Sequence, residues 1–380
     1  MRVVLDGQVT GADGISRCTR HLAAALRRLG AEQGLRLHVE QPSGVPRYSL
    51  AEGTHLVEVA RRHRADLLHL LDYRVPISTA PLPLVVTVHD LLRLRHPEHC
   101  YSDDAFVARF GSGGMSRLRE ATSALRRRTS WPPGAIRRPV SWHEEFYGRM
   151  TAHAAATATA VVTPTRTVAA HLREAVGHSV PTTAVPWGTD HLPGVGRETS
   201  PRVDGLRVGG YVLYVGQARS HKGLPALMEA FQRSAARRQG LRLVLAGRDF
   251  APGSSAIDGL EEHVLPVGEV DDLSLARLYA GAAAVAHLAE HEGFGFPPLE
   301  ALSFGARVLA ADIPVLRETL GSHAHFTDPG DPVAAAAALD HLLDSDDSLA
   351  IRRGRAMWAS RFRWDTCARQ VVDCYRKALA

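Results

Sequence analysis

Short apolar runs alternate with amphipathic segments along most of the chain. Runs such as Arg2–Asp6, Leu84–Val88 and Tyr211–Val215 are rich in Val and Leu, which is typical of strands buried on both faces. Segments such as Ile15–Leu29 and Leu224–Arg237 collect their apolar residues on one side, as amphipathic helices do. The alternation of the two patterns predicts βα units and mostly parallel sheets, which makes this an α/β protein.

The same two patterns predict the remaining strands and helices. Further strands are predicted at Leu35–Val39, Leu67–Leu71, Ala160–Val162, Thr183–Val185, Leu241–Ala246, Val264–Val267, Ala282–Leu288, Val308–Ala310 and Ala324–Thr327. Further helices are predicted at Glu144–Thr157, Thr165–Ala175, Asp272–Ala280, Val315–Leu320, Pro332–Leu343, Asp347–Phe362 and Asp365–Ala378. The chain therefore contains two series of βα units, one in each half.

Two segments interrupt the alternation. His96–Trp142 carries a glycine cluster, four prolines and several arginines, so we expect a long mobile insertion at about residues 100–142. Residues 191–207 are rich in Pro, Gly and polar side chains without periodicity, which predicts a linker. We divide the chain into a domain at 1–192, a linker at 193–207, a domain at 208–361 and a final helical segment at 362–380 that packs back on the first domain.

Composition narrows the class of protein. A chain of 380 residues with 45% hydrophobic and 22% charged residues has the size of two soluble domains. The net charge of +5 is scattered and joins no nucleic-acid-binding motif, so we expect no nucleic-acid partner. The four cysteines lack metal-ligand spacing, and the sequence shows neither a signal peptide nor a membrane span, so we expect a cytoplasmic protein.

The stretch Glu292–Glu300 contains the strongest candidate chemistry. It follows a buried strand, and Pro297 and Pro298 are tolerated only in the first turn of a helix. A helix start with Gly293 and Gly295 offers backbone N–H groups to a phosphate. The two flanking carboxylates are then suited to sugar hydroxyls, as acidic residues are in dinucleotide sites. Phosphate and polyol binding together suggest a nucleotide sugar, although an ordinary strand–turn–helix explains the motif alone equally well.

Three other residues are candidates on weaker grounds. His89 directly follows the strand Leu84–Val88, and the carboxyl ends of parallel strands line the ligand crevice. Gly14 opens a helix after a glycine-rich loop, which is a further anion-binding position. Lys222 follows a strand and a glycine and is one of only two lysines. Each of them is also compatible with a purely structural role.

The order of these motifs resembles the family 4 glycosyltransferases, which are retaining enzymes of the two-domain GT-B fold. In the second half the resemblance lies in Tyr214-Val215-Gly216, Lys222-Gly223, Leu245-Ala246-Gly247, Val267-Gly268, Leu278–Ala282, Glu292–Glu300 and Asp328-Pro329-Gly330-Asp331. In the first half it lies in Gly14–Arg17, Val86–Leu91, Pro97-Glu98 and Val162–Thr165. The resemblance implies two Rossmann-like, doubly wound parallel-sheet domains that face a cleft.

The resemblance also implies roles for the candidates. Lys222 would contact the donor diphosphate, Glu300 the ribose hydroxyls, and Glu292 the transferred sugar. His89 would approach that sugar from the other domain, and Gly14 would lie near the phosphates or the acceptor. The remaining donor-binding positions would be Gly216, Gln217, Val267, Gly293, Phe294, Gly295 and Phe296. Catalysis would rest on Glu292, His89 and Lys222, with no metal ion and no cofactor besides the nucleotide sugar.

Departures from the family pattern leave alternatives open. Gln217 stands where many relatives have Arg, so Arg219 or His221 would supply the second charge. Leu288-Ala289 replaces a common Pro-Ser pair. We predict a metal-independent, retaining hexosyltransferase; the alternatives are a catalytically impaired nucleotide-sugar-binding protein and a sugar phosphorylase or synthase. We expect the acceptor to be a small natural product or a saccharide, and we do not favour membrane association.

Overall fold

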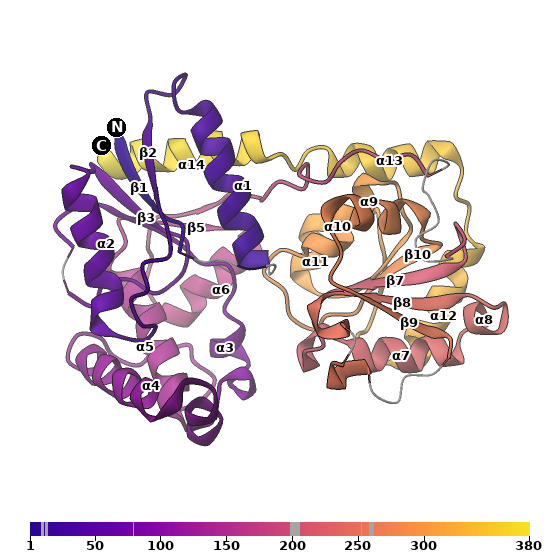
Figure 1. Ribbon diagram of the computed structural model, residues 1–380, viewed down its shortest axis with the longest axis horizontal. Coiled ribbons are helices and arrows are strands. Elements are labelled where there is room, and N and C mark those ends of the chain that lie inside the picture. The colour runs from indigo at the N-terminus through magenta and orange to yellow at the C-terminus, as the bar shows by residue number, and fades with distance from the viewer. Residues whose placement is uncertain (9–10, 12–13, 79, 198–205, 252, 258–261) are drawn as a thin grey trace. The chain divides into compact units, whose positions relative to one another are not determined.

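The structure is a computed structural model that describes residues 1–8, 11, 14–78, 80–197, 206–251, 253–257 and 262–380. Parts of two predicted segments, the loop at residues 7–14 and the linker at 193–207, lie outside the described residues. The chain forms two compact units, residues 1–187 with 364–380 and residues 188–363 (Figure 1). The second unit thus begins at residue 188, before the linker that we predicted.

The first unit is built on a six-stranded sheet in the order β2-β1-β3-β4-β5-β6. Every neighbouring pair in it is parallel. Its strands are β1 (Arg2–Asp6), β2 (Arg36–Glu40), β3 (Leu67–Leu70), β4 (Leu84–Thr87), β5 (Ala160–Thr163) and β6 (Thr182–Ala184). Its helices are α1 (Gly14–Leu29), α2 (Leu50–Arg62), α3 (Leu92–Arg95), α4 (Asp103–Arg126), α5 (Trp142–Thr157), α6 (Arg166–Val176) and α14 (Trp364–Leu379), with a 3-10 turn η1 (Pro97–His99).

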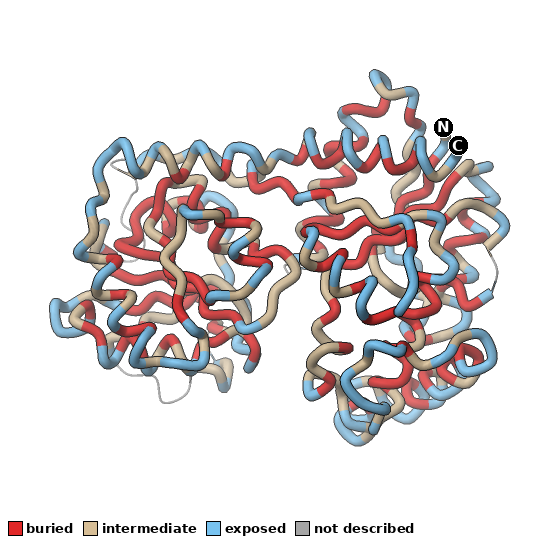
Figure 2. Tube along the Cα trace, turned by 180° about the vertical axis from the view of Figure 1, so that it is seen from behind, coloured by how far each residue is buried: buried red, intermediate tan, exposed pale blue. Residues whose placement is uncertain are grey.

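Alternate residues of the first sheet serve two cores. Val4, Leu68 and Val86 point to the face that packs against α2, α4 and α5, because successive side chains of a strand project to opposite faces. Figure 2 shows the buried strands in the middle of the unit. Both faces are covered, which explains why the strands read as continuous apolar runs.

The expected insertion at 100–142 is wrong in its main part, because residues 103–126 form the helix α4. The glycine cluster obscured it: Gly111 has a φ of +71° and kinks the helix. Apolar residues nevertheless recur at helical spacing and are buried against the sheet and α5, namely Phe106, Met115, Leu118, Ala121 and Leu125. Arg126, at the end of the helix, pairs with Glu145 of α5 at 2.6 Å. Packing of one face thus stabilises a helix whose glycines lower its intrinsic propensity.

The last helix, α14, returns to the first unit and lies beside α1 (Figure 1). A buried polar contact anchors it to the sheet. The hydroxyl of Tyr375 is 2.7 Å from Nδ1 of His69 on β3, and Nε2 of His69 is 2.9 Å from Oγ1 of Thr87 on β4. Both histidine nitrogens therefore have partners, as a buried imidazole requires.

The second unit is built on a six-stranded sheet in the order β12-β11-β10-β7-β8-β9. All its pairs are parallel. Its strands are β7 (Tyr211–Val215), β8 (Arg242–Ala246), β9 (Val264–Gly268), β10 (Ala284–His287), β11 (Val308–Ala311) and β12 (His325–Thr327). Its helices are α7 (Leu224–Arg233), α8 (Ala235–Arg238), α9 (Asp272–Gly281), α10 (Phe296–Ser303), α11 (Pro314–Leu320), α12 (Pro332–Asp344) and α13 (Leu349–Ala359), with 3-10 turns η2 (Ser220–Lys222), η3 (Arg248–Phe250) and η4 (Ser255–Ile257).

Each unit is therefore a doubly wound α/β domain, as the sequence predicted. In the second unit α7 and α12 pack together over one face of the sheet, against Val212, Leu243 and Ala286. The predicted helix Leu224–Arg237 is divided at Ser234, whose extended backbone ends α7 before α8 begins. The carboxyl ends of all six strands lie at one edge of each sheet, which is where ligands bind in this class of fold.

Candidate functional site

The strand order of the second sheet reverses between β7 and β10. These strands are parallel neighbours, although β8 and β9 separate them in the sequence. The chain leaves β7 toward one side of the sheet and leaves β10 toward the other, so the helices α7 and α10 that follow lie on opposite faces. Such a topological switch point is the usual ligand crevice of a doubly wound sheet.

The loop after β7 is packed closely against the loop after β10. Gly223 has a φ of +68°, and a Cβ there would collide with the carbonyl oxygen of Leu288. The backbone N–H of Glu290 donates to the carbonyl of His221 at 2.9 Å. Glycine at position 223 thus permits the close approach, and the approach carries the side chain of Lys222 to the second loop.

Lys222, Glu292 and His287 meet at this switch point. Nζ of Lys222 is 2.6 Å from Oε1 of Glu292, and Nε2 of His287 donates to the same oxygen at 2.9 Å. The side chain of Glu292 is 12% exposed and that of His287 is 2% exposed. Two of the predicted catalytic residues are therefore in direct contact, together with a histidine that we did not predict.

The surroundings of Glu292 keep its carboxyl group ionised. Burial by itself raises the pKa of the group, but the ammonium of Lys222 and the hydrogen bond from His287 lower it by more. The net pKa of Glu292 lies well below its usual range. At neutral pH the site thus holds a carboxylate, which can stabilise a cation or accept hydrogen bonds from hydroxyl groups.

The start of α10 has the backbone that the prolines predicted. Gly295 is left-handed with a φ of +83°, and a Cβ there would meet the side chain of Leu316. Pro297 and Pro298 lie in the first turn and have no N–H. The first turn therefore lacks two of its N–H donors, and the binding of a phosphate by the backbone of residues 293–296 stays a prediction.

The ring of Phe294 packs into the interior of the second unit. The ring of Phe294 is buried and packs edge-on against Phe296 and Phe362, with centroids 5.1 and 6.0 Å apart. These contacts fix the loop from beneath. Any donor contact of Phe294 would thus involve its main chain.

Glu300, which we predicted to bind ribose, is enclosed. Its side chain is 1% exposed; Tyr279 donates its hydroxyl to Oε2 at 2.9 Å, and Nε2 of His191 lies 3.2 Å from Oε1. Both carboxylate oxygens already have partners. The ribose contact stays a prediction, and it requires a rearrangement that makes the enclosed carboxylate accessible.

Three further predicted donor-binding residues lie at the carboxyl edge of the same sheet. Gly216 and Gln217 follow β7, and the carbonyl of Gln217 accepts the hydroxyl of Tyr214 at 2.8 Å. Val267 is near the end of β9, the edge strand. Of the two suggested substitutes for the missing arginine, His221 is buried whereas Arg219 is exposed, so Arg219 is the better placed to meet an anion.

The two remaining predicted residues, Gly14 and His89, belong to the first unit. Gly14 begins α1 after β1, and His89 follows β4, so both are at the carboxyl edge of the first sheet. Nε2 of His89 donates to the carbonyl of Leu71 at 2.9 Å, and its ring lies 5.8 Å from that of Trp187. The structure thus divides the predicted site residues between its two units.

Sequence reasoning missed His287, although a signal was present. It is the last residue of β10, and the strand-end argument that selected His89 applies to it equally. It lies inside the apolar run Ala282–Leu288, whose pattern predicts only a buried strand.

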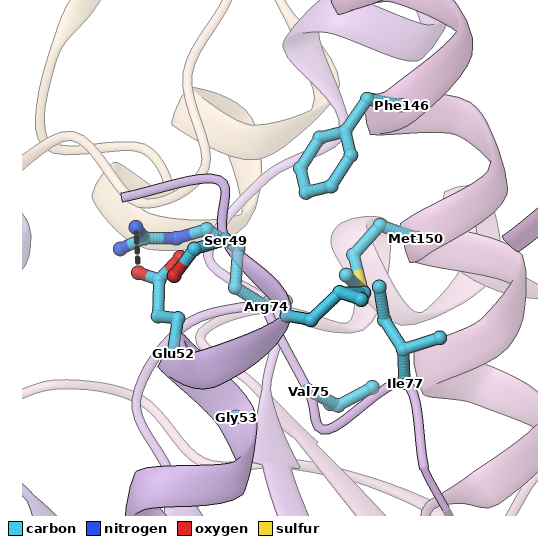
Figure 3. Close-up of a pocket in the computed structure, with 9 residues that line it drawn as sticks. Ser49, Glu52, Gly53, Arg74, Val75, Ile77, Phe146 and Met150 are labelled. Atoms are coloured by element: carbon cyan, nitrogen blue, oxygen red, sulfur yellow. Dashed lines mark hydrogen bonds and ion pairs between the residues drawn. The ribbon is translucent and has the colours of Figure 1, made fainter. Parts of the chain in front are cut away.

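A small cavity lies in the first unit between α2, α5 and residues 74–77 (Figure 3). Its volume of about 10 Å³ holds roughly one water molecule. The polar wall is formed by Arg74, which pairs with Glu52 and Asp72. It is too small for a sugar, so it is not the substrate site.

Two properties concern the described part of the chain as a whole. No helix within it combines the length and the apolar composition needed to cross a bilayer. Within the same residues, no group of three or more His, Cys, Asp or Glu side chains is arranged to hold a metal ion.

Sequence comparison finds a similarity between the second unit and a known protein family. Residues 206–356 match the family model described as Glycosyl transferases group 1. O-antigen chain mannosyltransferase B of Escherichia coli is 31% identical over 51% of this chain and 54% of its own length. Phosphatidyl-myo-inositol mannosyltransferase of Mycobacterium leprae is 30% identical over 47% of this chain and 49% of its own length. The match spans about half the length of these curated relatives.

Structural comparison covers nearly the whole chain. Sucrose-phosphate synthase from Thermosynechococcus elongatus superposes with a TM-score of 0.71 at 19% identity, over 99% of this chain and 98% of that one. Anabaena HepE in complex with UDP and glucose gives 0.67 at 18% identity, over 99% of both chains. At these identities the likeness concerns the fold, and it confirms the predicted GT-B architecture of two Rossmann-like domains.

Proposed function

We propose that this chain is a group 1 glycosyltransferase that moves a hexose from a nucleotide-diphosphate sugar to a hydroxyl group and retains the configuration at the anomeric carbon. The observation that carries the proposal is the contact of Lys222 with Glu292 at the switch point of the second sheet, 2.6 Å long. It places a cation and a carboxylate where the loops after β7 and β10 meet. A donor needs both charges, because its two ends develop opposite charge during transfer.

The cation serves the leaving group. Departure of a nucleoside diphosphate increases the negative charge on its phosphate oxygens. Once the donor is bound, Lys222 and the N–H groups at the start of α10 are in place before the bond breaks and stabilise this charge. Arg219, exposed beside η2, supplies the second positive charge in place of the residue that Gln217 replaces.

The carboxylate serves the sugar. The transferred sugar becomes oxocarbenium-like, and the ionised Glu292 either stabilises that cation or orients the sugar hydroxyls. For retention, the acceptor hydroxyl attacks on the face from which the diphosphate leaves. The bond from the anomeric carbon to the phosphate oxygen breaks, the bond to the acceptor oxygen forms, and the acceptor proton passes to the departing oxygen.

We further propose a small natural product or a saccharide as acceptor. Two relatives named as mannosyltransferases and a structural neighbour that binds UDP and glucose support a nucleotide sugar and direct the first choice of donors to mannose and glucose. His89 and Gly14 would act from the first unit, on the sugar and near the acceptor.

The direct test measures binding and turnover of a donor panel. The full chain is titrated by calorimetry with UDP-glucose, GDP-mannose and their nucleoside diphosphates, and sugar release is followed by mass spectrometry. We expect one nucleotide sugar to bind and to be hydrolysed slowly without an acceptor. Failure of every donor to bind would refute the proposal, whereas saturable binding without sugar release would favour an impaired binding protein.

Two further measurements test the finer parts of the proposal. Proton NMR of the first product reports the anomeric configuration, and inversion would exclude the retaining mechanism. Repeating the assay with excess EDTA tests metal independence: turnover should be unchanged, and its loss with recovery on Mg²⁺ addition would show that a metal takes part. Acceleration by inorganic phosphate would instead indicate a phosphorylase.

A further inference from the structure

We infer that His287 is a positioning residue for the transferred sugar: it holds Glu292 in place when the donor diphosphate draws Lys222 away. The inference rests on the proposed function, because it assigns a task to His287 within that same site. It concerns a residue on β10 that touches Glu292 and not the reacting atoms.

The hydrogen bonds of Glu292 are distributed unevenly. Lys222 and His287 both bind Oε1, at 2.6 and 2.9 Å. Among the described residues, no hydrogen bond reaches Oε2. One oxygen thus fixes the carboxylate, and the other remains available to a hydroxyl group of a bound sugar.

Lys222 pairs with two anions in turn, first the carboxylate of Glu292 and then the donor diphosphate. Before the donor binds, it pairs with Glu292. A diphosphate carries more negative charge than one carboxylate and competes for the same ammonium, whose long side chain adjusts easily. If Lys222 were the only partner of Glu292, its departure would leave a mostly buried carboxylate unpaired, which is strongly unfavourable.

His287 cannot follow the phosphate. It is the last residue of β10, paired in register with Ala310 of β11, and its side chain is 98% buried, since 2% is exposed. A short side chain on a central strand has little freedom to move. His287 therefore keeps Oε1 in place while Lys222 changes partner.

The tautomer agrees with this task. A carboxylate only accepts hydrogen bonds, so Nε2 of His287 carries a proton and donates it to Glu292. The other nitrogen, Nδ1, is buried without a hydrogen-bond partner among the described residues. The hydrogen bond to Glu292 is therefore the one that holds the ring in this orientation.

The experiment compares three substitutions of His287 in the full chain. In His287→Gln the amide nitrogen replaces Nε2 as a donor to Glu292. In His287→Asn the amide is too short to reach it, and in His287→Leu the donor is absent. His325→Leu, on the edge strand β12 of the same sheet, serves as the matched control, and thermal unfolding verifies that each variant folds.

Measuring both ligands distinguishes a positioning role of His287 from a merely structural one. We expect His287→Leu and His287→Asn to bind the nucleoside diphosphate as the unaltered chain does. Their binding of the nucleotide sugar and their kcat should fall about tenfold to a hundredfold, which corresponds to one hydrogen bond to a charged group. His287→Gln should recover most of both quantities, and His325→Leu should change neither.

A double substitution shows whether His287 acts through Glu292. In a Glu292→Gln background, His287→Leu should cause no further loss of nucleotide-sugar binding. Unchanged sugar binding and kcat in His287→Leu would overturn the inference. So would equal loss of nucleoside diphosphate and nucleotide sugar, since that indicates a structural role. If the unaltered chain binds no nucleotide sugar at all, it is the proposed function that fails.

Discussion

At the scale of single residues, the ion pair of Lys222 and Glu292 is the central feature of the site. The family resemblance implies that Lys222 contacts the diphosphate and that Glu292 contacts the transferred sugar. The two side chains lie 2.6 Å apart. Before a donor binds, the charge of each therefore offsets the free-energy cost of burying the charge of the other. Replacing one of them changes both its own contact and the state of its partner. The choice of substitution therefore decides what an experiment reports.

Glu292→Gln should reduce kcat by at least about a hundredfold, because it removes the charge that stabilises the sugar cation and keeps the shape of the side chain. Binding of the nucleoside diphosphate should stay the same or tighten, since Lys222 is released from its carboxylate. Steady-state kinetics and calorimetry measure both effects. Glu229→Gln, on the exposed surface of α7, is the matched control and should be neutral; retained turnover in Glu292→Gln would remove Glu292 from the mechanism.

Lys222→Ala should weaken the binding of nucleoside diphosphate and nucleotide sugar alike, by about tenfold or more, because the ammonium contacts the group that they share. Lys377→Ala removes the other lysine of the chain, which is exposed on α14, and should leave binding unchanged. Calorimetric titration of both variants with the same ligands makes the comparison. Selective loss of the nucleotide sugar alone would place Lys222 at the sugar and not at the diphosphate.

The assignment of Glu300 to the ribose is testable without turnover. Glu300→Gln should weaken binding of the nucleoside diphosphate about tenfold, since a neutral amide accepts hydroxyl hydrogen bonds less strongly than a carboxylate. Binding of inorganic pyrophosphate, which has no ribose, should not change. Equal weakening of both ligands would show that Glu300 and its partners Tyr279 and His191 maintain the fold of the site.

At the scale of elements, the site depends on how closely the loops after β7 and β10 pack. That packing requires glycine at position 223, where a Cβ would collide with the carbonyl oxygen of Leu288. A strand end and a helix start can be predicted from local patterns. Their contact cannot, because it joins Lys222 to Glu292, which are 70 residues apart in sequence.

Gly223→Ala should lower both stability and donor binding, because it combines an unfavourable φ with a backbone collision. Gly240→Ala is the control: Gly240 has a similar φ of +80°, but no atom lies within 4 Å of the position of its Cβ. We expect the control to lose roughly 1 kcal/mol of stability and to keep its affinity. Urea unfolding and calorimetry compare them; equal effects in both variants would show that only φ matters.

The helix α4 shows where local reasoning fails at this scale. Its glycines and arginines suggested an insertion at residues 100–142, yet Leu118 and Leu125 are fully buried. Each such side chain contributes about 1.5–3 kcal/mol when it leaves water. This gain equals or exceeds the helix propensity lost at the three glycines of the helix, about 1 kcal/mol each. The apolar surface that buries these side chains belongs to the sheet and to α5. A pattern within residues 103–126 alone contains no information about that surface.

At the scale of the whole molecule, the final helix ties the end of the chain to the first unit through His69. Burial, aided by the nearby His89, lowers the pKa of His69 to about 3. In the unfolded chain the pKa is about 6.5. Below pH 6.5 the unfolded state therefore binds a proton that the folded state does not, and the contribution of His69 to stability decreases as the pH falls.

His69→Gln should be less stable than the unaltered chain at pH 7.5, because Tyr375 and Thr87 lose part of their hydrogen bonding. The difference should narrow as the pH falls, by about 1.4 kcal/mol at pH 5.5, since only the unaltered chain has this histidine to protonate. Urea unfolding from pH 7.5 to 5.5, followed by a signal from the first unit, measures the difference. A constant difference would mean that the pKa of His69 is not lowered.

The sequence alone determined the alternation of strands and helices, the two α/β halves and the residues at the strand ends. These features depend on local periodicity, on the backbone limits of Pro and Gly, and on which side chains are buried. Glu292, Glu300 and Lys222 could be named for the same reason, since each lies next to or within a predictable turn between a strand and a helix.

Only the tertiary structure decided which of these residues meet. It paired Lys222 with Glu292, added His287 and enclosed Glu300 between His191 and Tyr279. It also turned the glycine-rich segment at 103–126 into a helix. Contacts between residues far apart in sequence depend on strand order and on the fit of surfaces from different elements. Neither the strand order nor this fit can be predicted from the pattern within a single segment.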